Sequence, residues 1–384
     1  MSTIEKICVI SNLFPPYPAE TSGMFLYNLV IKFVQQGKTC VVIRPTSYSK
    51  SIFKRKPLPP LKEVVSIPGG EIIIYSPRFF SVSSRHRLLL ELSYKTKERA
   101  VLRQYKRIGI QFDALYAHFF TSGRTAWAVN KVYGVPFFTA HGESNFSVKF
   151  NYLGIRRIKE FYTQCNGVVA VSSHIKESIL ENYGLSQDKV VVEPNGTDLT
   201  LFRPMSKLQA RKQVAIPEHE LVVLFVGSLI ERKGPRRLAK ALEGLDHIHG
   251  YFIGKGQESI PDAAGNIHLC GERKQSDVVT YMNAADVFVL PTLAEGSSNV
   301  IVEALACGLP VISSDRDFNT DILDESCSIL VDPTDVGQIR EAILTLANNR
   351  ELRDEKAQAA LERGRQLDIM ERAKRILSFM EQHI

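Results

Sequence analysis

Short runs of consecutive apolar residues alternate along this chain with longer segments whose apolar positions recur at helical spacing. A continuous apolar run bounded by turn residues is typical of a strand that is buried on both faces of a sheet. Such strands alternating with helices predict an α/β fold with two doubly wound parallel sheets. The predicted strands are residues 6–11, 39–44, 71–75, 114–118, 136–140 and 167–171 in the first half, and 221–226, 249–253, 266–269, 287–290 and 310–314 in the second.

The length of the chain, 384 residues, is too great for a single compact core, so two domains are expected. Turn-forming residues between 194 and 198 mark the boundary. We predict an N-terminal domain over residues 1–200, a C-terminal domain over 201–366, and a final helix over 367–384 that crosses back to the N-terminal domain. Ligands bind such sheets at the carboxyl ends of the strands, which here are expected to face a cleft between the domains.

The composition is that of a globular protein, because 44% of the residues are hydrophobic and 23% are charged. No apolar run approaches the ~18 residues that a membrane span requires. The start of the chain is polar and acidic, so we expect no signal peptide. The six cysteines are scattered without paired spacing, as reduced thiols are. Together these features predict a cytoplasmic protein.

The net charge of +7 favours an acidic partner. Basic residues are concentrated between positions 84 and 108, where Leu88 and Leu92 lie opposite much of the charge. This segment is either a basic amphipathic helix that contacts an anionic membrane or an ordinary solvated helix. Nucleic acid is not an expected partner, because the cations are not interleaved with aromatic residues in any recognised module.

The clearest chemistry lies between residues 292 and 310, where a buried strand is followed by a tight turn at 296–298 and by helix-forming residues. Such a turn directs the free amides of Ser298, Asn299 and Val300 at one point. Because the helix dipole adds positive charge there, the site favours a phosphate group.

Two carboxylates flank this predicted anion site. Glu303, one turn into the helix, can accept two hydrogen bonds from a ribose diol, and Glu295, on the loop, can meet a second polyol. The alternative is that Glu295 is a solvated loop residue and Glu303 an ordinary surface residue. The apolar neighbours of Glu303 disfavour that alternative, because a charge inside an apolar helix needs a partner.

Arg232 and Lys233 follow another buried strand, at residues 221–226. A guanidinium group and an ammonium group side by side can neutralise a diphosphate whose charge grows as its bond breaks. The alternative is an exposed charged turn.

His141 ends a predicted strand, and Gly142 after it is expected to leave the ring accessible, which makes His141 a candidate site residue. For His118 we favour a hydrogen-bonded role in the fold. His247 and His249 are placed in a turn, where two ligands without a third make no metal site. Gly23, before a predicted helix, would let a phosphate approach the backbone, although this signal is weak alone.

Two further patterns are read as ordinary structure. Residues 252–257 resemble half of a dinucleotide fingerprint but lack the third glycine and the helix, so a plain strand-to-loop turn is at least as good a reading. Asp315 and Asp317 lie in a predicted surface loop. We expect no metal there, because Arg232 and Lys233 already supply positive charge.

Taken together, these motifs closely resemble the family 4 retaining glycosyltransferases, and the match spans nearly the whole chain. The motifs are Glu295 with Glu303, residues 227–234, residues 193–198 with 202–204, and residues 303–311. The resemblance implies the GT-B fold, with two Rossmann-like domains, the nucleotide mainly on the second and the acceptor mainly on the first. It implies no cofactor and no required metal.

The resemblance also implies roles for individual residues. Glu303 would hold the ribose, and Glu295 would contact hydroxyl groups of the donor sugar. Arg232 and Lys233 would hold the diphosphate. The amides near Asn299 and Val300, together with Ser298, would complete the pocket. Gly23 would approach the phosphates from the other domain. His141 would lie near the donor sugar.

The chain departs from the family pattern at three places. Ser228 stands where the family often has Arg, so that Arg232 must supply that role. The first loop has Ser22-Gly23 in place of a Gly-Gly pair, and residues 317–323 lack the common Gly-Gly-x-x-Glu pattern, which puts the contacts of that loop in doubt.

From the resemblance we expect retaining transfer of a hexosyl unit from a nucleoside diphosphate sugar, with a UDP-sugar as the favoured donor. The catalytic set would be His141, Glu295, Lys233 and Arg232. The acceptor would be a saccharide or a lipid-linked saccharide in bacterial surface polysaccharide synthesis, with peripheral contact at the inner face of an anionic membrane. The alternatives are a sugar-nucleotide epimerase of the same fold and a nucleotide-sugar or anionic-surface binder without turnover.

Overall fold

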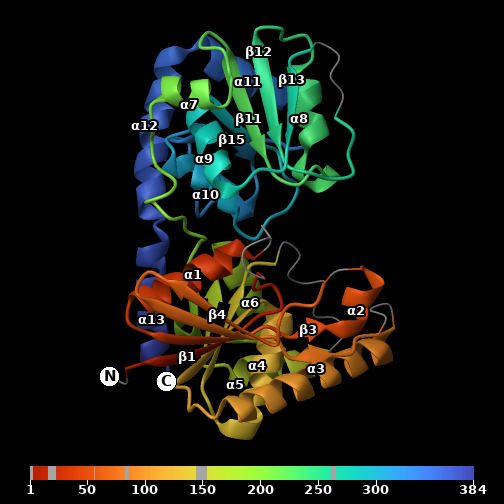
Figure 1. Cartoon of the computed structure of the whole chain (residues 1–384). Helices are drawn as coiled ribbons and strands as arrows, with labels where there is room; N and C mark the ends of the chain where they lie inside the picture. Colours follow the sequence, from red (N-terminus) through yellow and green to blue (C-terminus); the bar gives the residue numbers. More distant parts are fainter. Residues whose placement is uncertain (1–2, 16–22, 56, 83–85, 144–153, 261–264) are drawn as a thin grey trace. The chain divides into compact units, whose positions relative to one another are not determined.

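The computed structural model describes residues 3–15, 23–55, 57–82, 86–143, 154–260 and 265–384 (Figure 1). The chain folds into two compact units. Unit 1 comprises Met1–Glu193 with Met370–Ile384, and unit 2 comprises Pro194–Ile369. The chain therefore passes twice from one unit to the other.

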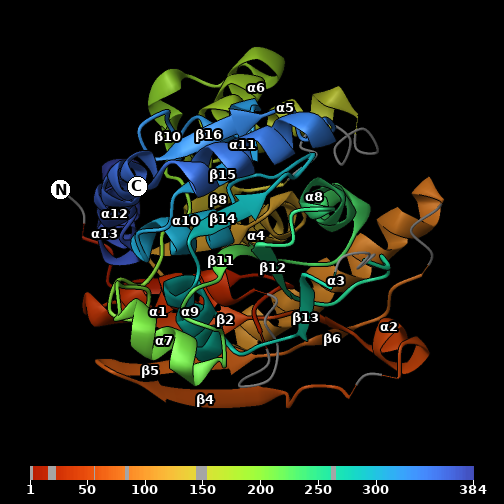
Figure 2. The same cartoon turned by 90° about the horizontal axis from the view of Figure 1, so that it is seen from above.

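Unit 1 is built on an eight-stranded sheet with the order β10-β9-β8-β7-β1-β2-β5-β4. All neighbouring strands are parallel except β4 and β5, which form an antiparallel hairpin at the edge (Figure 2). A second, two-stranded sheet pairs β3 with β6. The strands are β1 (Lys6–Ile10), β2 (Thr39–Ile43), β3 (Thr46–Ser47), β4 (Lys62–Ile67), β5 (Gly70–Tyr75), β6 (Arg78–Phe79), β7 (Ala114–His118), β8 (Phe137–His141), β9 (Gly167–Ala170) and β10 (Val190–Val192).

The central strands of unit 1 are buried at nearly every position, which is why their sequences read as continuous apolar runs. The helices of unit 1 are α1 (Met24–Gln35), α2 (Tyr48–Phe53), α3 (Arg87–Ile108), α4 (Phe120–Tyr133), α5 (Ile155–Gln164), α6 (Ser173–Tyr183), the short η1 (Gln187–Lys189) and the final helix α13 (Ile369–Gln382). Apart from α2 and η1, in which no residue is buried, these helices each bury a set of apolar residues.

Helix α13 is held to unit 1 by charged groups as well as by apolar packing. The buried guanidinium of Arg372 donates to the main-chain oxygen of Glu193 at 3.3 and 3.2 Å. Arg375 donates to both carboxylate oxygens of Glu193 at 2.9 and 3.0 Å. Glu193 is the last residue of unit 1 before the chain first crosses to unit 2, so these bonds join the two places where the chain leaves the unit.

Unit 2 contains a six-stranded parallel sheet with the order β13-β12-β11-β14-β15-β16. Its strands are β11 (Leu221–Val226), β12 (Ile248–Ile253), β13 (Ile267–Gly271), β14 (Val287–Leu290), β15 (Val311–Ser314) and β16 (Ser328–Val331). Its helical segments are α7 (Lys207–Gln213), η2 (Glu231–Lys233), α8 (Pro235–Leu242), α9 (Gln275–Ala284), α10 (Asn299–Ala306), η3 (Asp317–Asn319), α11 (Val336–Asn348) and α12 (Arg350–Gln366).

Each sheet has one place where the direction of strand addition reverses. In unit 2, β12 and β13 follow on one side of β11 and β14 follows on the other. In unit 1 the reversal falls between β1 and β7. The loops that leave the carboxyl ends of two such strands diverge, which opens a crevice at that edge of the sheet where ligands bind. The two reversal points therefore locate a candidate site in each unit.

The predicted strands are confirmed, but five strands were missed: the two-residue strands β3 and β6, which pair only with each other, and the edge strands β4, β10 and β16. Strand β4 carries polar residues at several positions and is partly exposed, because it lies at the sheet edge, so it shows no continuous apolar run. Its partner β5 follows after a two-residue turn in which Gly69 has a φ of 95°. Strands β10 and β16 are short edge strands whose sequences lie within longer mixed segments.

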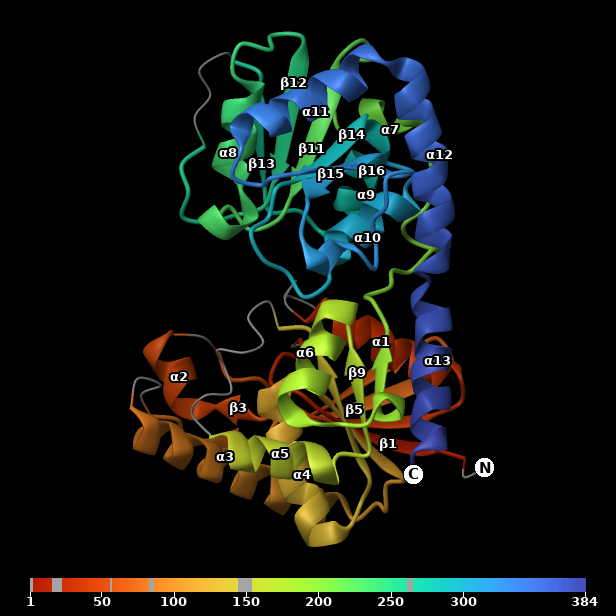
Figure 3. The ribbon, with the colours of Figure 1, turned by 180° about the vertical axis from the view of Figure 1, so that it is seen from behind.

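The position of α10 depends on close packing against α12 (Figure 3). A Cβ atom added at Gly364 would lie 2.6 Å from backbone atoms of Ala306, which is too close for the two helices to keep their distance. The absence of a side chain at Gly364 thus lets the backbones approach and supports the helix that begins the candidate site.

We expect Gly364→Ala to lower the free energy of unfolding by about 1–3 kcal/mol, because the added methyl group must separate α10 from α12. At an open helical position the same change would instead stabilise the protein by up to about 1 kcal/mol. Gly337→Ala is the matched control, because a Cβ atom there meets only the side chain of Asp335, at 3.1 Å. Chemical denaturation measures both, and stabilisation by Gly364→Ala would contradict the packing argument.

Candidate active site

The reversal point of unit 2 brings together three of the predicted site residues. Arg232 and Lys233 lie in η2, after β11, and Glu295 lies on the loop after β14. Glu295 Oε1 is 2.5 Å from Lys233 Nζ and 3.1 Å from Arg232 Nη1. Thr292 Oγ1 donates to the same oxygen at 2.8 Å. The prediction that these side chains share one site is consistent with this geometry.

The two oxygens of the Glu295 carboxylate differ in their surroundings. All the contacts of this side chain with described residues are made by Oε1, whereas Oε2 accepts no hydrogen bond from the described part of the chain. The side chain as a whole is 10% exposed. One oxygen therefore orients the group, and the other is left for a ligand hydroxyl.

The loops after β11 and β14 are fastened to one another through their backbones. Leu293 donates to the oxygen of Arg232 at 2.8 Å. Gly234 has a φ of 78°, and a Cβ atom at this residue would lie 2.5 Å from the oxygen of Pro291. Only glycine fits this contact without displacing the neighbouring loop. The cations are thereby fixed beside Glu295 by main-chain geometry rather than by side-chain contacts alone.

Helix α10 begins at the same edge, and its first turn contains polar atoms without partners. Ser298 Oγ and Asn299 Oδ1 are buried, and neither has a hydrogen-bond partner among the described residues. Buried polar atoms are nearly always bonded, so two orphans beside the unpaired amides of a helix start mark a ligand site. Val300, the next residue of this turn, is partly buried.

Ser297, just before this turn, has a structural partner instead. Its Oγ accepts from the amide of Asn195 at 3.1 Å, and its main-chain oxygen accepts from Asn195 Nδ2 at 2.9 Å. Asn195 belongs to the motif at residues 193–198, whose role was not assigned from sequence. Its function in the structure is to hold the turn that precedes α10.

Glu303 occupies a very different environment from Glu295. Its side chain is partly buried in α10, and in the described structure its only hydrogen bond is from Gln275 Nε2 at 3.3 Å. Burial raises the pKa of Glu303 to about 8, and the bond from Gln275 offsets only part of this effect. A carboxylate that is desolvated but poorly bonded gains much from a ligand that brings hydrogen-bond donors, such as a vicinal diol.

His141, in unit 1, does not have the accessible ring that was predicted. The ring is fully buried at the end of β8, with Nδ1 3.2 Å from Glu143 Oε2 and Nε2 3.3 Å from the hydroxyl of Tyr162. The prediction failed because Gly142 gives only local freedom, whereas Tyr162 of α5 covers the ring from a distant part of the chain.

Glu143 connects His141 to the start of α4. Its Oε1 accepts from the amide of Phe120 at 2.8 Å, while its Oε2 faces His141 and accepts from the amide of Gly142 at 3.2 Å. Burial alone would raise the pKa of Glu143, but His141 and these backbone bonds bring it below its ordinary value. Glu143 was not among the predicted site residues, although its position two residues after His141 was a signal.

The reversal point of unit 1 lies beside His118 rather than His141. His118 ends β7, its ring is 2% exposed, and its Nδ1 has no partner among the described residues. Burial lowers the pKa of His118 to about 3, and Arg372 contributes to the shift, so the ring is neutral. We predicted that His118 is hydrogen-bonded within the fold, but no described residue bonds to its Nδ1 atom. Phe119, which follows, has a φ of 66°, a strained value that clusters at functional sites.

Gly23 begins α1, whose residue Phe25 packs on His118 with ring centroids 4.8 Å apart. Gly23 has a φ of 88°, and a Cβ atom there would lie 1.7 Å from the oxygen of Leu13. Its glycine identity is therefore explained by contact within the chain. Residues 16–22, including Ser22 of the predicted phosphate loop, lie outside the described residues.

Two other candidates are placed away from these sites. Asp315 and Asp317 are exposed in the loop after β15, as predicted. The turn at 254–256 is also plain structure: a Cβ atom at Gly256 would lie 1.9 Å from the oxygen of Leu229, so the glycine serves contact between two loops. Both observations favour the structural readings of these motifs.

The prediction for His249 is wrong in two respects. His249 lies in β12, not in a turn, and the amino edge of the sheet brings Glu220 and His268 close to it. The facing ring nitrogens of His249 and His268 are 3.1 Å apart and the ring planes differ by 20°. These values describe rings that point at each other in a direct hydrogen bond, whereas two ligands of one ion would point at a third position. Glu220, His249 and His268 lie far apart in the sequence, so the sequence pattern did not reveal that they are close in space.

All six cysteines are free thiols. None of the helices in the described part of the chain combines the length and the apolar character that crossing a membrane requires.

Comparison with known proteins gives two matching family models. The model described as Glycosyltransferase Family 4 matches residues 22–201, and the model described as Glycosyl transferases group 1 matches residues 220–349. The chain is also 27% identical over 352 residues to TuaC of Bacillus subtilis strain 168, a glycosyltransferase named for teichuronic acid biosynthesis, with 88% of each chain covered. It is 27% identical over 381 residues to a D-inositol 3-phosphate glycosyltransferase of Nocardia farcinica, covering 89% of this chain and 80% of that one.

Solved structures share the fold. A sucrose-phosphate synthase from Thermosynechococcus elongatus superimposes with a TM-score of 0.81 at 19% identity, covering 98% of both chains. Anabaena HepE in complex with UDP-glucose gives a TM-score of 0.71 at 16% identity, covering 97% of this chain and 98% of that one.

The raised pKa of Glu303 predicts a pH-dependent stability. Between its ordinary value of 4.5 and about 8, the folded state holds a proton at Glu303 that the unfolded state has lost. The free energy of unfolding should therefore fall as the pH rises through this window, by up to about 1.4 kcal/mol per pH unit from this group. Glu303→Gln should remove that slope and gain stability over the parent protein toward high pH.

Urea denaturation of both proteins from about pH 5 to about pH 9 measures this difference. Glu341→Gln serves as the control, because Glu341 is exposed on α11. Stability curves for the parent and Glu303→Gln that run parallel over the whole range would show that Glu303 is not desolvated.

Proposed function

Because this chain belongs to glycosyltransferase family 4 and has the GT-B fold, we propose that it transfers a hexosyl unit from a nucleoside diphosphate sugar to a hydroxyl group of a saccharide or lipid-linked saccharide, with retention of configuration. The observation that carries the proposal is the reversal point of unit 2. There an unpaired helix start, two cations and two carboxylates in contrasting environments meet at the carboxyl edge of one sheet.

A UDP-sugar is the proposed donor. HepE is described in complexes with UDP and with UDP-glucose, and the Escherichia coli trehalose-6-phosphate protein is described with UDP-2-fluoro glucose. The site in unit 2 has groups suited to each part of such a molecule. Glu303 would accept hydrogen bonds from the ribose diol, and its carboxylate form would be favoured by these donors. The amides of Ser298, Asn299 and Val300 would bind phosphate oxygens.

Lys233 and Arg232 would face the diphosphate, and Glu295 would bind the sugar. An ammonium group has three donors, so Lys233 can keep its contact with Glu295 Oε1 while it also binds a phosphate oxygen. Glu295 Oε2, which lacks a described partner, would accept from hydroxyl groups of the hexose. Because Glu295 is neutralised by two cations, it is a weak nucleophile, which favours a route without a covalent sugar–enzyme bond.

In the proposed step, the bond between C1 of the sugar and the diphosphate oxygen breaks while a bond forms between C1 and the acceptor oxygen on the same face. The proton of the acceptor hydroxyl passes to the leaving phosphate oxygen. Negative charge grows on that phosphate as the bond breaks, so Lys233, Arg232 and the α10 amides stabilise the transition state more than the ground state. These groups supply the positive charge that the step requires.

Unit 1 is proposed as the acceptor side, as predicted for residues 1–200, with residues 201–366 as the donor side. His141 would act near the donor sugar through the end of β8, where Glu143 fixes the orientation of its ring. Gly23 would approach the phosphates from α1. The relatives named for teichuronic acid and inositol phosphate support a role in the synthesis of bacterial surface glycoconjugates. A cytoplasmic location with peripheral membrane contact fits that role.

We expect Lys233→Ala to lower kcat by about a hundredfold to a thousandfold, because it removes a donor that stabilises the leaving diphosphate. Lys207→Ala is the matched control in the same unit. Lys207 pairs with Asp286 at the other end of the sheet and is 46% exposed, so its loss should change turnover by about twofold at most. Release of UDP from a verified donor and acceptor pair measures the rate.

The same assay separates the proposed activity from its alternatives. UDP release that depends on the acceptor indicates transfer, and product with the anomeric configuration of the donor indicates retention. Isomerised UDP-sugar in the absence of acceptor would indicate an epimerase instead. Donor binding in a thermal-shift screen with no product of either kind would leave a binding protein. Equal turnover of Lys233→Ala and the parent enzyme would refute the role of Lys233.

A further inference from the structure

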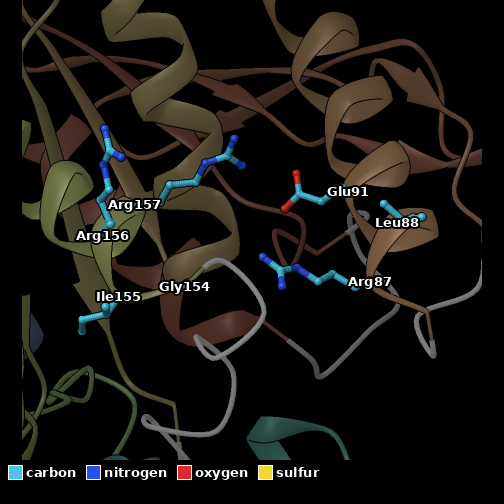
Figure 4. Close-up of a pocket in the computed structure, with 7 residues that line it drawn as sticks. All are labelled: Arg87, Leu88, Glu91, Gly154, Ile155, Arg156 and Arg157. Carbon is cyan, nitrogen blue, oxygen red and sulfur yellow. The ribbon is translucent and has the colours of Figure 1, made fainter.

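A positively charged pocket lies in unit 1, outside the sites described above. It has a volume of about 710 Å³ and is lined by Arg87, Leu88, Glu91, Gly154, Ile155, Arg156 and Arg157. The first three belong to the start of α3, and the others form the start of α5 (Figure 4). This volume is within the range of ligand sites in proteins, roughly 300–1,000 Å³.

The pocket lies at the carboxyl side of the unit 1 sheet. Helix α5 follows β8 and leads into β9, so it starts near the edge where the strands end. Helix α3 leads into the beginning of β7, so its own beginning lies toward the same edge. This is the edge at which sheets of this kind bind ligands. The pocket is therefore on the side of unit 1 where an acceptor is expected.

The arginines occupy electrostatically unfavourable positions. Arg87 is the first residue of α3, Arg156 and Arg157 are the second and third of α5, and neither helix has an acidic residue in its first turn. The dipole already makes a helix start positive, so cations there repel it. No ion pair or side-chain hydrogen bond joins these three residues to any other described residue. A bound anion would remove this repulsion.

The acidic residue of the pocket, Glu91, is paired mainly with Arg124, and the charge of Arg157 also lowers the pKa of Glu91. Arg124 of α4 binds both oxygens of Glu91, at 2.9 and 2.8 Å, and also donates to Glu98 at 2.8 Å. The guanidinium groups of Arg87 and Arg157 approach the space before Glu91 from opposite sides, while Arg156 points along α5 (Figure 4). Two rigid forks directed at one space suit phosphate oxygens.

Two apolar side chains of the pocket lining are exposed. Leu88 is 84% exposed and Ile155 is 56% exposed. The described lining contains no aromatic side chain that could pack against a sugar ring. A phosphate group joined to a hydrocarbon chain would instead match both the arginines and the exposed leucine and isoleucine.

We propose that this pocket binds the diphosphate group of a lipid-linked acceptor, with Arg87 and Arg157 on the phosphate oxygens and Leu88 and Ile155 against the first part of the lipid chain. The proposal depends on the proposed function, because the bound molecule is an acceptor only if the protein is a glycosyltransferase. Between the two acceptor classes considered for this enzyme, it favours the lipid-linked saccharide over the free saccharide.

Farnesyl diphosphate, inorganic diphosphate and vesicles of phosphatidylglycerol with phosphatidylcholine are the probes, because they separate the chain, the phosphates and a bilayer surface. The test variant is Arg87→Gln/Arg157→Gln. The matched control is Arg99→Gln/Arg103→Gln, which removes the same charge from exposed positions further along α3. All these side chains are exposed, so the variants should fold, and circular dichroism checks this. Binding of diphosphate in unit 2 is common to every protein and cancels in the comparison.

We expect farnesyl diphosphate to bind the test variant at least about tenfold more weakly than the parent protein, and the control variant unchanged, by isothermal titration calorimetry. Inorganic diphosphate should bind the pocket more weakly than farnesyl diphosphate. Equal binding of farnesyl diphosphate by both variants would overturn the proposal. So would a loss confined to vesicle binding, which would make the pocket a bilayer contact. Because the readout is binding, it is independent of whether the chain shows acceptor-dependent turnover.

Discussion

The chemistry of unit 2 depends on one carboxylate oxygen. Glu295 Oε1 receives donors from Lys233, Arg232 and Thr292, and so it joins the loop after β11 to the loop after β14 at the point where the sheet reverses its order. Without a ligand, two adjacent cations would repel each other, and the glutamate holds them together. The same contact leaves Oε2 for a substrate hydroxyl. A single interaction thus holds together the two cations proposed to stabilise a leaving diphosphate and orients the group proposed to bind the sugar.

The second carboxylate of this site, that of Glu303, has the opposite surroundings. Among the described residues Glu303 has no cation beside it and only one weak donor, so burial raises its pKa to about 8. The difference suits two different tasks. A group whose orientation must not change during transfer is anchored by charges, whereas a group that recognises a neutral diol is kept desolvated and poorly bonded, so that the ligand itself supplies the missing hydrogen bonds. Because both lie in one short segment, the proposed recognition of the nucleotide would be coupled to the position of the sugar.

Much of this arrangement could be predicted from sequence because it is local. Continuous apolar runs identified the buried strands, and residues just after a strand necessarily lie at its carboxyl edge, which is how Arg232, Lys233 and Glu295 were found. The failures concern contacts between distant segments. Tyr162 covers His141 from α5, and His268 reaches His249 from the adjacent strand. Such contacts depend on strand order and register, which apolar periodicity does not determine. The same applies to edge strand β4, whose partial exposure removes the pattern that reveals a buried strand.

The structure also separates two kinds of motif residue that look alike in the sequence. Glu193 and Asn195 are polar and lie in a motif that resembles those of glycosyltransferases, yet both are engaged by the protein itself. Glu193 holds Arg375, and Asn195 holds the turn that precedes α10. By contrast, Ser298 Oγ and Asn299 Oδ1 are buried and find no partner in the described part of the chain. Since a buried polar group without a partner costs free energy, its persistence needs a compensating ligand, whereas a satisfied group needs none. Unsatisfied polar atoms, rather than motif membership, are therefore the basis on which Ser298 and Asn299 are proposed to bind a substrate, whereas Glu193 and Asn195 stabilise the surrounding structure.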